Sequence, residues 1–339
     1  MTYEIVIPVI VSFAISALLG PIVIPFLRRL KVGQTERKEL ESHLKKNGTP
    51  TMGGLMILAS IIITSVFYVK DYPKIVPILF MTVGFGVIGF LDDYLKVVLR
   101  RSDGLLAWQK MLCQIVVTTV FAVYMGCYSD VPLTMLIPFS GGKYLDLGWG
   151  AFPVLYLAVI GTVNGTNFTD GLDGLASSVT IMVATFFSVV AIGTNAGIAP
   201  ITCAVAGALL GFLLFNVYPA SVFMGDTGSL TLGGIIAVFA IIIRKELLIP
   251  ILCGIFLVEN LSVLMQTFYF KYTKKKYGEG RRIFKMAPLH HHFQKPGNAG
   301  IQALIQKPFN VVPESKIVVR FWLIGIILAV ITIVTLKMR

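Results

Sequence analysis

Long apolar runs, separated by short charged or turn-rich stretches, follow one another along almost the whole chain. Most of them come close to the roughly 20 apolar residues that a helix needs to cross a bilayer. The predicted helices lie at residues 3–27, 51–69, 75–91, 108–127, 150–163, 175–193, 198–217, 229–243, 247–269 and 317–336. We therefore expect an all-α, polytopic membrane protein with about ten transmembrane helices, built as a single domain over residues 1–339.

Two segments depart from the regular pattern. Residues 128–149 mix Pro and Gly with short apolar stretches and predict a hairpin outside the membrane. The run at 247–269 carries Glu259, Asn260 and Gln266 among its apolar residues, so it lacks the pattern of a plain membrane span.

The composition agrees with a membrane protein. Hydrophobic residues make up 56% of the chain and charged residues 14%, whereas soluble domains carry about 25% charged residues. This content of apolar side chains also excludes an intrinsically disordered chain.

The chain has a net charge of +12, and its Lys and Arg residues are distributed unevenly between the two predicted sides of the membrane. With ten spans, the loops at 28–49, 92–110 and 271–316 share one side and hold roughly 21 Lys and Arg residues, against about seven on the other side. Because cytoplasmic loops carry the excess of basic residues, we expect these three loops in the cytoplasm and both termini outside it. This orientation explains the positive charge, and we expect no nucleic-acid partner.

Acidic residues stand at the predicted cytoplasmic boundary. Asp92 and Asp93 close an apolar run, where adjacent carboxylates repel each other and lose hydration unless a cation lies between them. The simpler alternative is a solvated loop start, with Lys96 as a helical partner. Asp226, just before the eighth predicted span, is either functional or the cap of that helix.

Another polar cluster interrupts apolar sequence at residues 164–174. Asn164, Asn167, Asp170 and Asp173 recur every three residues, which would place all four on a common helix face. The glycines in this segment let a backbone or a ligand approach closely. A polar loop between helices is the alternative, and it explains the Asn and Gly residues but not two acids beside lipid.

The predicted topology brings five of the seventeen acidic residues to one membrane face, namely Asp92, Asp93, Asp170, Asp173 and Asp226. Clusters of oxygen ligands without Cys suit Mg²⁺ or Mn²⁺, with water and substrate phosphates completing the coordination.

Basic residues and histidines accompany these acids. Lys46 and Thr51 belong to a segment rich in Lys, Thr and Gly that suits phosphate binding, although an ordinary basic loop would look similar. Residues 290–292 are three adjacent histidines without the Cys or the i, i+4 spacing of a zinc site, so contact with anionic phosphate or carbohydrate is favoured. Together these groups indicate phosphoryl transfer between a polar donor and a lipid.

Five motifs resemble, in this order, those of the polyprenyl-phosphate N-acetylhexosamine-1-phosphate transferase family, and within it the phospho-N-acetylmuramoyl-pentapeptide transferases. The motifs are GTPTMGG (48–54), DDYLK (92–96), NGTNFTDGLDGLA (164–176), FMGDTGS (223–229) and PLHHHF (288–293). They span nearly the whole chain. Gln294 departs from the pattern, because the family has Glu after HHHF, and this puts an acid–base role at that position in doubt.

The resemblance implies a reaction and its setting. UDP-MurNAc-pentapeptide and undecaprenyl phosphate would give lipid I and UMP, with Mg²⁺ as cofactor, in peptidoglycan synthesis. The enzyme would be a homodimer in the bacterial plasma membrane, with its active site facing the cytoplasm. The family's ninth helix is broken, and Pro250, Gly254 and Glu259 are compatible with such a break.

The resemblance also implies roles for individual residues. Asp226 would be the Mg²⁺ ligand, and Asp92 and Asp93 would face the lipid phosphate, one of them as general base or as nucleophile. We favour the base, although the second pKa of a phosphate monoester near 6 leaves positioning the larger task. His290 would act with these acids as a catalytic residue.

The remaining implied contacts are with substrates. The residues that would contact the nucleotide are Asn167, Asp170, Gly171 and Asp173, and the residues that would line the uridine-diphosphate pocket are Lys46, Thr51, Asn216 and Gln266. The residues that would lie near the diphosphate-sugar are Ala287, His290 and His291. Further substrate-binding residues would be Lys96, Asn164, Phe223 and His292.

Three alternatives stay open at this point. The same chemistry with UDP-GlcNAc as donor is the nearest. A secondary transporter would have acids near the bilayer midplane, where Glu259 is the only one deep in a predicted helix. A structural scaffold predicts that Asp92→Asn would be tolerated.

Overall fold

The computed structural model describes residues 2–30, 48–99, 101, 104–297 and 302–337. The helices are α1 (Thr2–Arg29), α3 (Gly54–Val66), α4 (Ile75–Val97), α5 (Ala107–Cys127), α6 (Ala151–Thr169), α7 (Leu175–Gly193), α8 (Ala199–Asn216), α9 (Gly225–Ile242), α10 (Ile249–Leu252), α11 (Gly254–Tyr277), α12 (Leu289–Gln294) and α13 (Glu314–Lys337), with short 3-10 turns η1 (Gly148–Gly150) and η2 (Glu246–Leu248). The strands are β1 (Thr134–Leu136), β2 (Tyr144–Asp146), β3 (Arg282–Phe284) and β4 (Ala303–Ile305).

The all-α, multi-pass architecture is confirmed, and each of the ten predicted segments contains a helix. Among the described residues, eight helices are long and apolar enough to cross a membrane, and the bent pair α10–α11 would be a ninth. The remaining segment, 51–69, was predicted too long. Its helix, α3, has 13 residues, about 20 Å, which is short of a bilayer's hydrocarbon core of about 30 Å.

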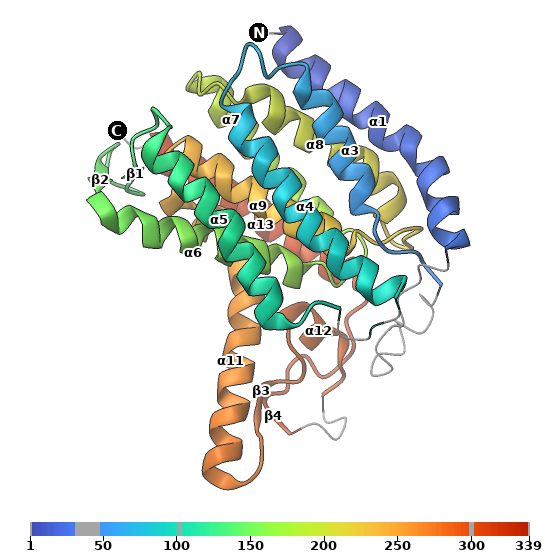
Figure 1. The fold of residues 1–339 in the computed structure, drawn as a ribbon. Coiled ribbons are helices and arrows are strands. Elements are labelled where there is room, and N and C mark those ends of the chain that lie inside the picture. The colour runs from blue at the N-terminus through green and yellow to red at the C-terminus, as the bar shows by residue number, and fades with distance from the viewer. Residues whose placement is uncertain (1, 31–47, 100, 102–103, 298–301, 338–339) are drawn as a thin grey trace.

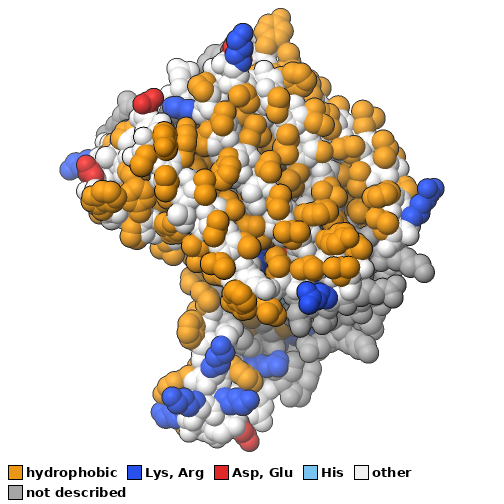
Figure 2. Space-filling view, viewed as in Figure 1, with side chains coloured by type: hydrophobic (Ala, Val, Ile, Leu, Met, Phe, Trp, Pro, Cys, Tyr) orange, Lys and Arg blue, Asp and Glu red, His pale blue; other side chains and the backbone are white. Residues whose placement is uncertain are grey.

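The helices pack side by side around α9 (Figure 1). α9 contacts α3, α4, α6 and α7, and every residue in it except Asp226 is buried. The outer helices expose their apolar side chains, which cover the bundle face seen in Figure 2. Both labelled ends of the chain lie at the end of the bundle away from the protruding part of α11 (Figure 1).

Glycines allow α3 and α4 to approach the beginning of α9 closely. A Cβ atom added at Gly89 of α4 would overlap the backbone of Asp226, and one added at Gly54 of α3 would overlap the backbone of Gly228. Residues three and four positions after Gly89 lie on the same face of α4. The close approach therefore sets Asp92 and Asp93 against the start of α9.

Two helices extend further into the polar motifs than predicted. α6 continues to Thr169 instead of ending at 163, and α9 begins at Gly225 instead of 229. In α6 the hydroxyls of Thr166 and Thr169 donate to carbonyls four residues back, at 2.9 and 2.7 Å. Such local bonds let polar residues continue a helix.

The predicted hairpin and the predicted break of the ninth helix are both present. β1 and β2 form an antiparallel hairpin within residues 128–149. The ninth predicted helix is broken, because η2–α10 and α11 meet at an angle of 79°. α11 then leaves the bundle, with α12 and the parallel pair β3–β4 beside it (Figure 1). Lys274, Lys275 and Lys276 form its last turn, in the basic protruding region of Figure 2.

Candidate active site

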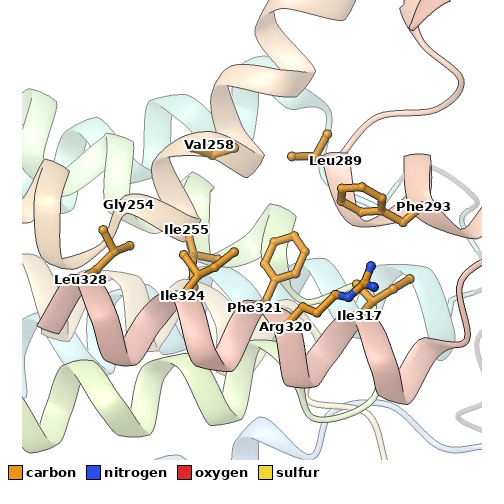
Figure 3. A pocket seen from close by; sticks show the side chains of 10 residues that line it. All are labelled: Gly254, Ile255, Val258, Leu289, Phe293, Ile317, Arg320, Phe321, Ile324 and Leu328. Carbon is orange, nitrogen blue, oxygen red and sulfur yellow. The ribbon is translucent and has the colours of Figure 1, made fainter. Parts of the chain in front are cut away.

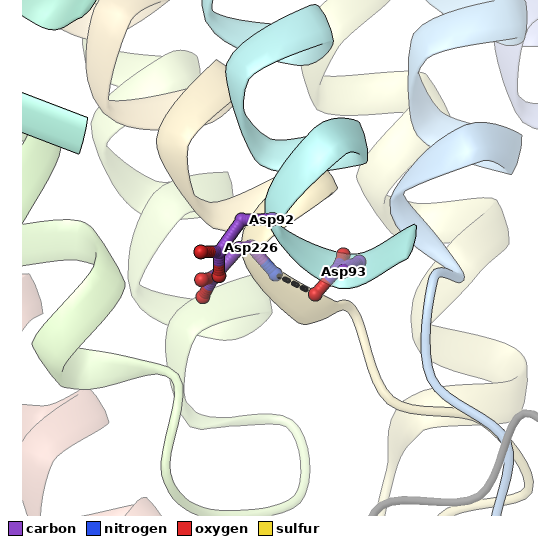
Figure 4. A group of neighbouring side chains, drawn as sticks. All are labelled: Asp92, Asp93 and Asp226. Carbon is purple, nitrogen blue, oxygen red and sulfur yellow. Dashed lines mark hydrogen bonds between the residues drawn. The ribbon is translucent and has the colours of Figure 1, made fainter. Parts of the chain in front are cut away.

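Three carboxylates converge where α4 meets the beginning of α9. Asp92, Asp93 and Asp226 each offer one oxygen atom, and these three oxygens lie within 4.8 Å of one another (Figure 4). The group joins acids more than 130 positions apart in the sequence. It contains only oxygen donors, the kind that Mg²⁺ and Mn²⁺ prefer. These residues therefore fit a divalent cation.

The two adjacent aspartates have different tasks. Asp93 accepts hydrogen bonds from the backbone N–H groups of Asp226 (3.1 Å) and Thr227 (2.9 Å) and from the Thr227 hydroxyl (2.6 Å). These are free N–H groups of the first turn of α9, so Asp93 caps this helix from a neighbouring one. The capping role considered for Asp226 thus belongs to Asp93.

Two lysines surround the other carboxylates. Lys96 Nζ lies 2.5 Å from Asp92 Oδ2 and 3.0 Å from Asp226 Oδ2. Lys110 Nζ lies 2.6 Å from the same Asp226 oxygen and 3.5 Å from Asp92 Oδ2. Lys110 was missed by the sequence analysis. A signal existed, because a lysine in the first turn of a helix opposes the helix dipole and needs another reason to be there.

Asn167 and Asp170 complete the surroundings of Asp226. The amide of Asn167 donates to Asp226 Oδ1 at 2.6 Å and to the Ser229 hydroxyl at 2.9 Å. Desolvation by burial, and then the nearby carboxylates of Asp226 and Asp93, raise the pKa of Asp170 to about 8. This acid is therefore largely protonated at pH 7, and added positive charge in the site would favour its ionisation.

The GTPTMGG and FMGDTGS motifs pair through their backbones. The Phe223 N–H donates to the carbonyl of Pro50 at 2.8 Å, and the N–H groups of Gly53 and Gly54 donate to residues 223 and 224, both at 2.9 Å. Thr51, which is buried, lies against Gly225 at the start of α9. Lys46 lies outside the described residues.

The predicted three-residue series is only partly helical. Asn164 and Asn167 lie on α6, but the helix ends at Thr169, so the prediction of one common face is wrong for Asp170 and Asp173. Asp173 instead accepts the N–H of Ala220 at 2.9 Å. The turn begins directly after Thr169, since Asp170, the C-cap residue of α6, has a non-helical conformation.

Other predicted site residues make bonds within the protein. Asn164 pairs with Gln114 at 2.9 Å. Asn216 accepts from Ser177 and donates to the carbonyl of Val222, at 2.7 and 3.0 Å. These bonds fix the shape of the site's walls.

Gln266 and the start of α12 are fixed in a similar way. The Gln266 side chain bonds the backbone of Ile283 and Phe284 at 2.9–3.1 Å and so holds β3 against α11. Ala287 comes directly before Pro288, the N-cap of α12.

The three adjacent histidines of α12 are all buried but differ in their partners. His290 Nδ1 lies 3.2 Å from Glu259 Oε2, and His291 Nδ1 lies 2.8 Å from Gln294 Oε1. His292 Nδ1 accepts the Lys285 N–H at 3.1 Å. Burial lowers the pKa of His292, which favours the neutral ring.

His290 faces the loop that follows α6. A Cβ added at Gly171 would overlap His290 Nε2, so only glycine lets the ring approach this backbone. The rings of His290 and His291 lie 4.1 Å apart. The structure thus brings α12 to the residue that follows Asp170, while Gln294, the departure from the family pattern, holds His291.

Known proteins similar to this chain match it along nearly its whole length. The profile "Glycosyl transferase family 4" matches residues 75–244, and "Phospho-N-acetylmuramoyl-pentapeptide-transferase signature 1" matches residues 46–58. The chain is 47% identical to the phospho-N-acetylmuramoyl-pentapeptide-transferase of Parabacteroides distasonis, over 97% of this chain and 93% of the relative. It belongs to the phospho-N-acetylmuramoyl-pentapeptide-transferase family.

Further members of the family come from distant bacteria. Identity is 45% to the protein of Bacillus subtilis, over 96% of this chain and 95% of the relative, and 44% to that of Acetivibrio thermocellus, over 97% and 94%. Membership confirms the resemblance found in the sequence and makes the protein a phosphosugar transferase.

Proposed function

We propose that this protein transfers phospho-MurNAc-pentapeptide from UDP-MurNAc-pentapeptide to undecaprenyl phosphate, which gives lipid I and UMP for peptidoglycan synthesis. The observation that carries the proposal is the identity of 40–47% to transferases of that name along nearly the full chain. The convergence of acids and lysines supports it, because phosphoryl transfer depends mainly on positioning and charge neutralisation.

The carboxylates of Asp226, Asp92 and Asp93 are the proposed Mg²⁺ site, with Asp226 as the principal ligand. When bound, the ion would withdraw charge from the diphosphate of the donor. Asn167 holds Asp226 Oδ1 in orientation. Lys96 and Lys110 are placed to neutralise phosphate oxygens beside the same carboxylates.

The different tasks of Asp92 and Asp93 suggest which one faces the acceptor. Both oxygens of Asp93 accept hydrogen bonds from α9, so its role is to hold the site in shape. Asp92 accepts the Leu105 N–H through Oδ1 at 2.8 Å and shares its Oδ2 with the ammonium groups of two lysines, groups that a phosphate can also bind. Asp92 would orient, or take a residual proton from, the lipid phosphate. An oxygen of that phosphate forms a bond to the β-phosphorus of the donor, while the P–O bond to UMP breaks and UMP leaves with its electron pair.

An apolar cavity supports a lipid acceptor. It has a volume of about 350 Å³ and lies between α11, α12 and α13 (Figure 3). Leu289 and Phe293, on either side of the three histidines, line it, and so do Ile324 and Leu328 deeper along α13. Arg320 is its only charged lining residue. The cavity would take part of the isoprenoid chain.

The proposed setting is the cytoplasmic face of the bacterial plasma membrane. It is supported by the excess of Lys and Arg in the loops on the side of the site. We also propose, from the resemblance to the family, that the protein works as a homodimer.

An assay of UMP release from purified protein tests the proposed function. We expect release only with UDP-MurNAc-pentapeptide, undecaprenyl phosphate and Mg²⁺ together, and none when EDTA removes the metal. Release with UDP-GlcNAc, and none with UDP-MurNAc-pentapeptide, would replace this proposal by the GlcNAc-1-phosphate branch.

A larger side chain at the cavity should weaken the acceptor selectively. In Ile324→Trp we expect the KM for undecaprenyl phosphate to rise about tenfold, or about 1.4 kcal/mol, because the larger side chain would fill part of the cavity. The KM for the sugar nucleotide should stay unchanged. Ile326→Trp is the matched control, since Ile326 is exposed on the same helix and is not among the residues that line the cavity. Equal effects of the two variants would contradict a chain in the cavity.

A further inference from the structure

Glu259 is a fully buried carboxylate in the second turn of α11. Its Oε1 accepts the backbone N–H of His290 at 3.1 Å, and its Oε2 lies 3.2 Å from the Nδ1 of the same residue. The backbone of Leu289 also donates to this carboxylate. A buried carboxylate is costly unless several donors satisfy it, and here the first residues of α12 supply them.

These bonds determine which ring nitrogen of His290 is presented to the site. A carboxylate that already accepts two backbone N–H groups acts as an acceptor, so His290 Nδ1 carries the hydrogen. The other nitrogen, Nε2, is then the one that lies against Gly171, next to Asp170. In this tautomer Nε2 carries the lone pair that can accept a proton, and in the imidazolium it can donate to a phosphate oxygen.

The neighbouring histidine shows that this arrangement is specific. His292 Nδ1 accepts the backbone N–H of Lys285, and its Nε2 lies 2.7 Å from the carbonyl of Lys307. His292 therefore carries its hydrogen on Nε2, the opposite tautomer. These two histidines of one short helix hold different tautomers because different partners face them.

We propose that Glu259 is a positioning residue for His290: it fixes the hydrogen on Nδ1 and aims Nε2 at the loop 170–174. The inference rests on the proposed function, in which His290 contacts the diphosphate-sugar. Glu259 lies just beyond the bend in the broken helix, so its bonds to His290 connect α11 to the site. The carboxylate stabilises positive charge on His290 when the anionic donor approaches.

Solid-state ¹⁵N NMR of histidine-labelled protein in lipid tests the tautomer without any turnover. The chain has four histidines, and His290→Gln identifies the signals of His290 by their loss. We expect a protonated Nδ1 at His290 and an unprotonated Nδ1 at His292. An unprotonated Nδ1 at His290 would overturn the proposal, whether or not the protein has the proposed activity.

Kinetics of Glu259→Gln test the consequence for the reaction. We expect kcat to fall about 10- to 100-fold, as for other carboxylates that orient a functional histidine, with the KM for undecaprenyl phosphate unchanged. The matched control is Glu246→Gln, a buried glutamate at the start of the same broken span, which should keep its kcat. A kcat for Glu259→Gln equal to that of the control would refute the positioning role. If the wild type instead lacks transferase activity while the tautomer is as expected, the proposed function fails and not the tautomer.

Discussion

Replacing Asp226 by asparagine should lower kcat at least about 10³-fold while the protein still folds. Asparagine keeps the size of the side chain and a bond to Asn167, but it removes the negative charge between Lys96, Lys110 and the proposed cation. UMP release measures the turnover, and Mn²⁺ binding followed by electron paramagnetic resonance measures the metal site independently. Both should be lost together.

The control for this variant is Glu279→Gln, which removes an exposed carboxylate from the protruding end of α11. It should leave both Mn²⁺ binding and turnover unchanged. If Asp226→Asn kept tight Mn²⁺ binding, the assignment of Asp226 as principal ligand would be wrong.

Gly171→Ala should have the second large effect, a loss of about 10² in kcat. The added Cβ would overlap His290 Nε2. The ring has little room to move, because His290 is buried and Glu259 holds both its backbone and its Nδ1. The expected structural result is therefore that the loop after α6 and the His290 ring move apart, which breaks the contact between them.

Gly161→Ala provides the comparison within α6. A Cβ at Gly161 would have no atom within 4 Å, and alanine favours a helix by up to about 1 kcal/mol over glycine. This variant should keep full turnover and the same or a higher melting temperature. Full turnover in Gly171→Ala as well would show that His290 need not lie close to this loop.

The long apolar runs predicted the helices well, because lipid-facing and core-facing side chains are both apolar in most of them. The prediction was wrong at the ends of the helices that carry the site residues, namely the end of α6 and the beginning of α9. Polar residues such as Thr166 were left outside the predicted span 150–163, whereas their hydroxyls bond the preceding turn and extend α6. The short α3 was predicted too long because its apolar sequence continues past Val66 after the helix ends.

The convergence of Asp92, Asp93 and Asp226 was predictable, but the division of tasks among them was not. Sequence spacing cannot reveal that Asp93 caps α9, because its partners lie more than 130 residues away. Lys110 and Glu259 also bond residues on other helices, and sequence spacing does not identify those partners. In the sequence Glu259 was the acid that kept a transporter possible, whereas in the structure it hydrogen-bonds α12.

The burial of α9 inside the bundle has a consequence for the geometry of the acidic site when detergent replaces the membrane. Asp226 is carried by a helix whose other residues are all shielded from lipid by neighbouring helices. When detergent replaces the bilayer, the lateral pressure on the outer helices changes, yet neither lipid nor detergent contacts the buried residues of α9. The distance between Asp226 and the two aspartates of α4 should therefore be preserved after extraction into detergent, even where the outer helices become less tightly packed.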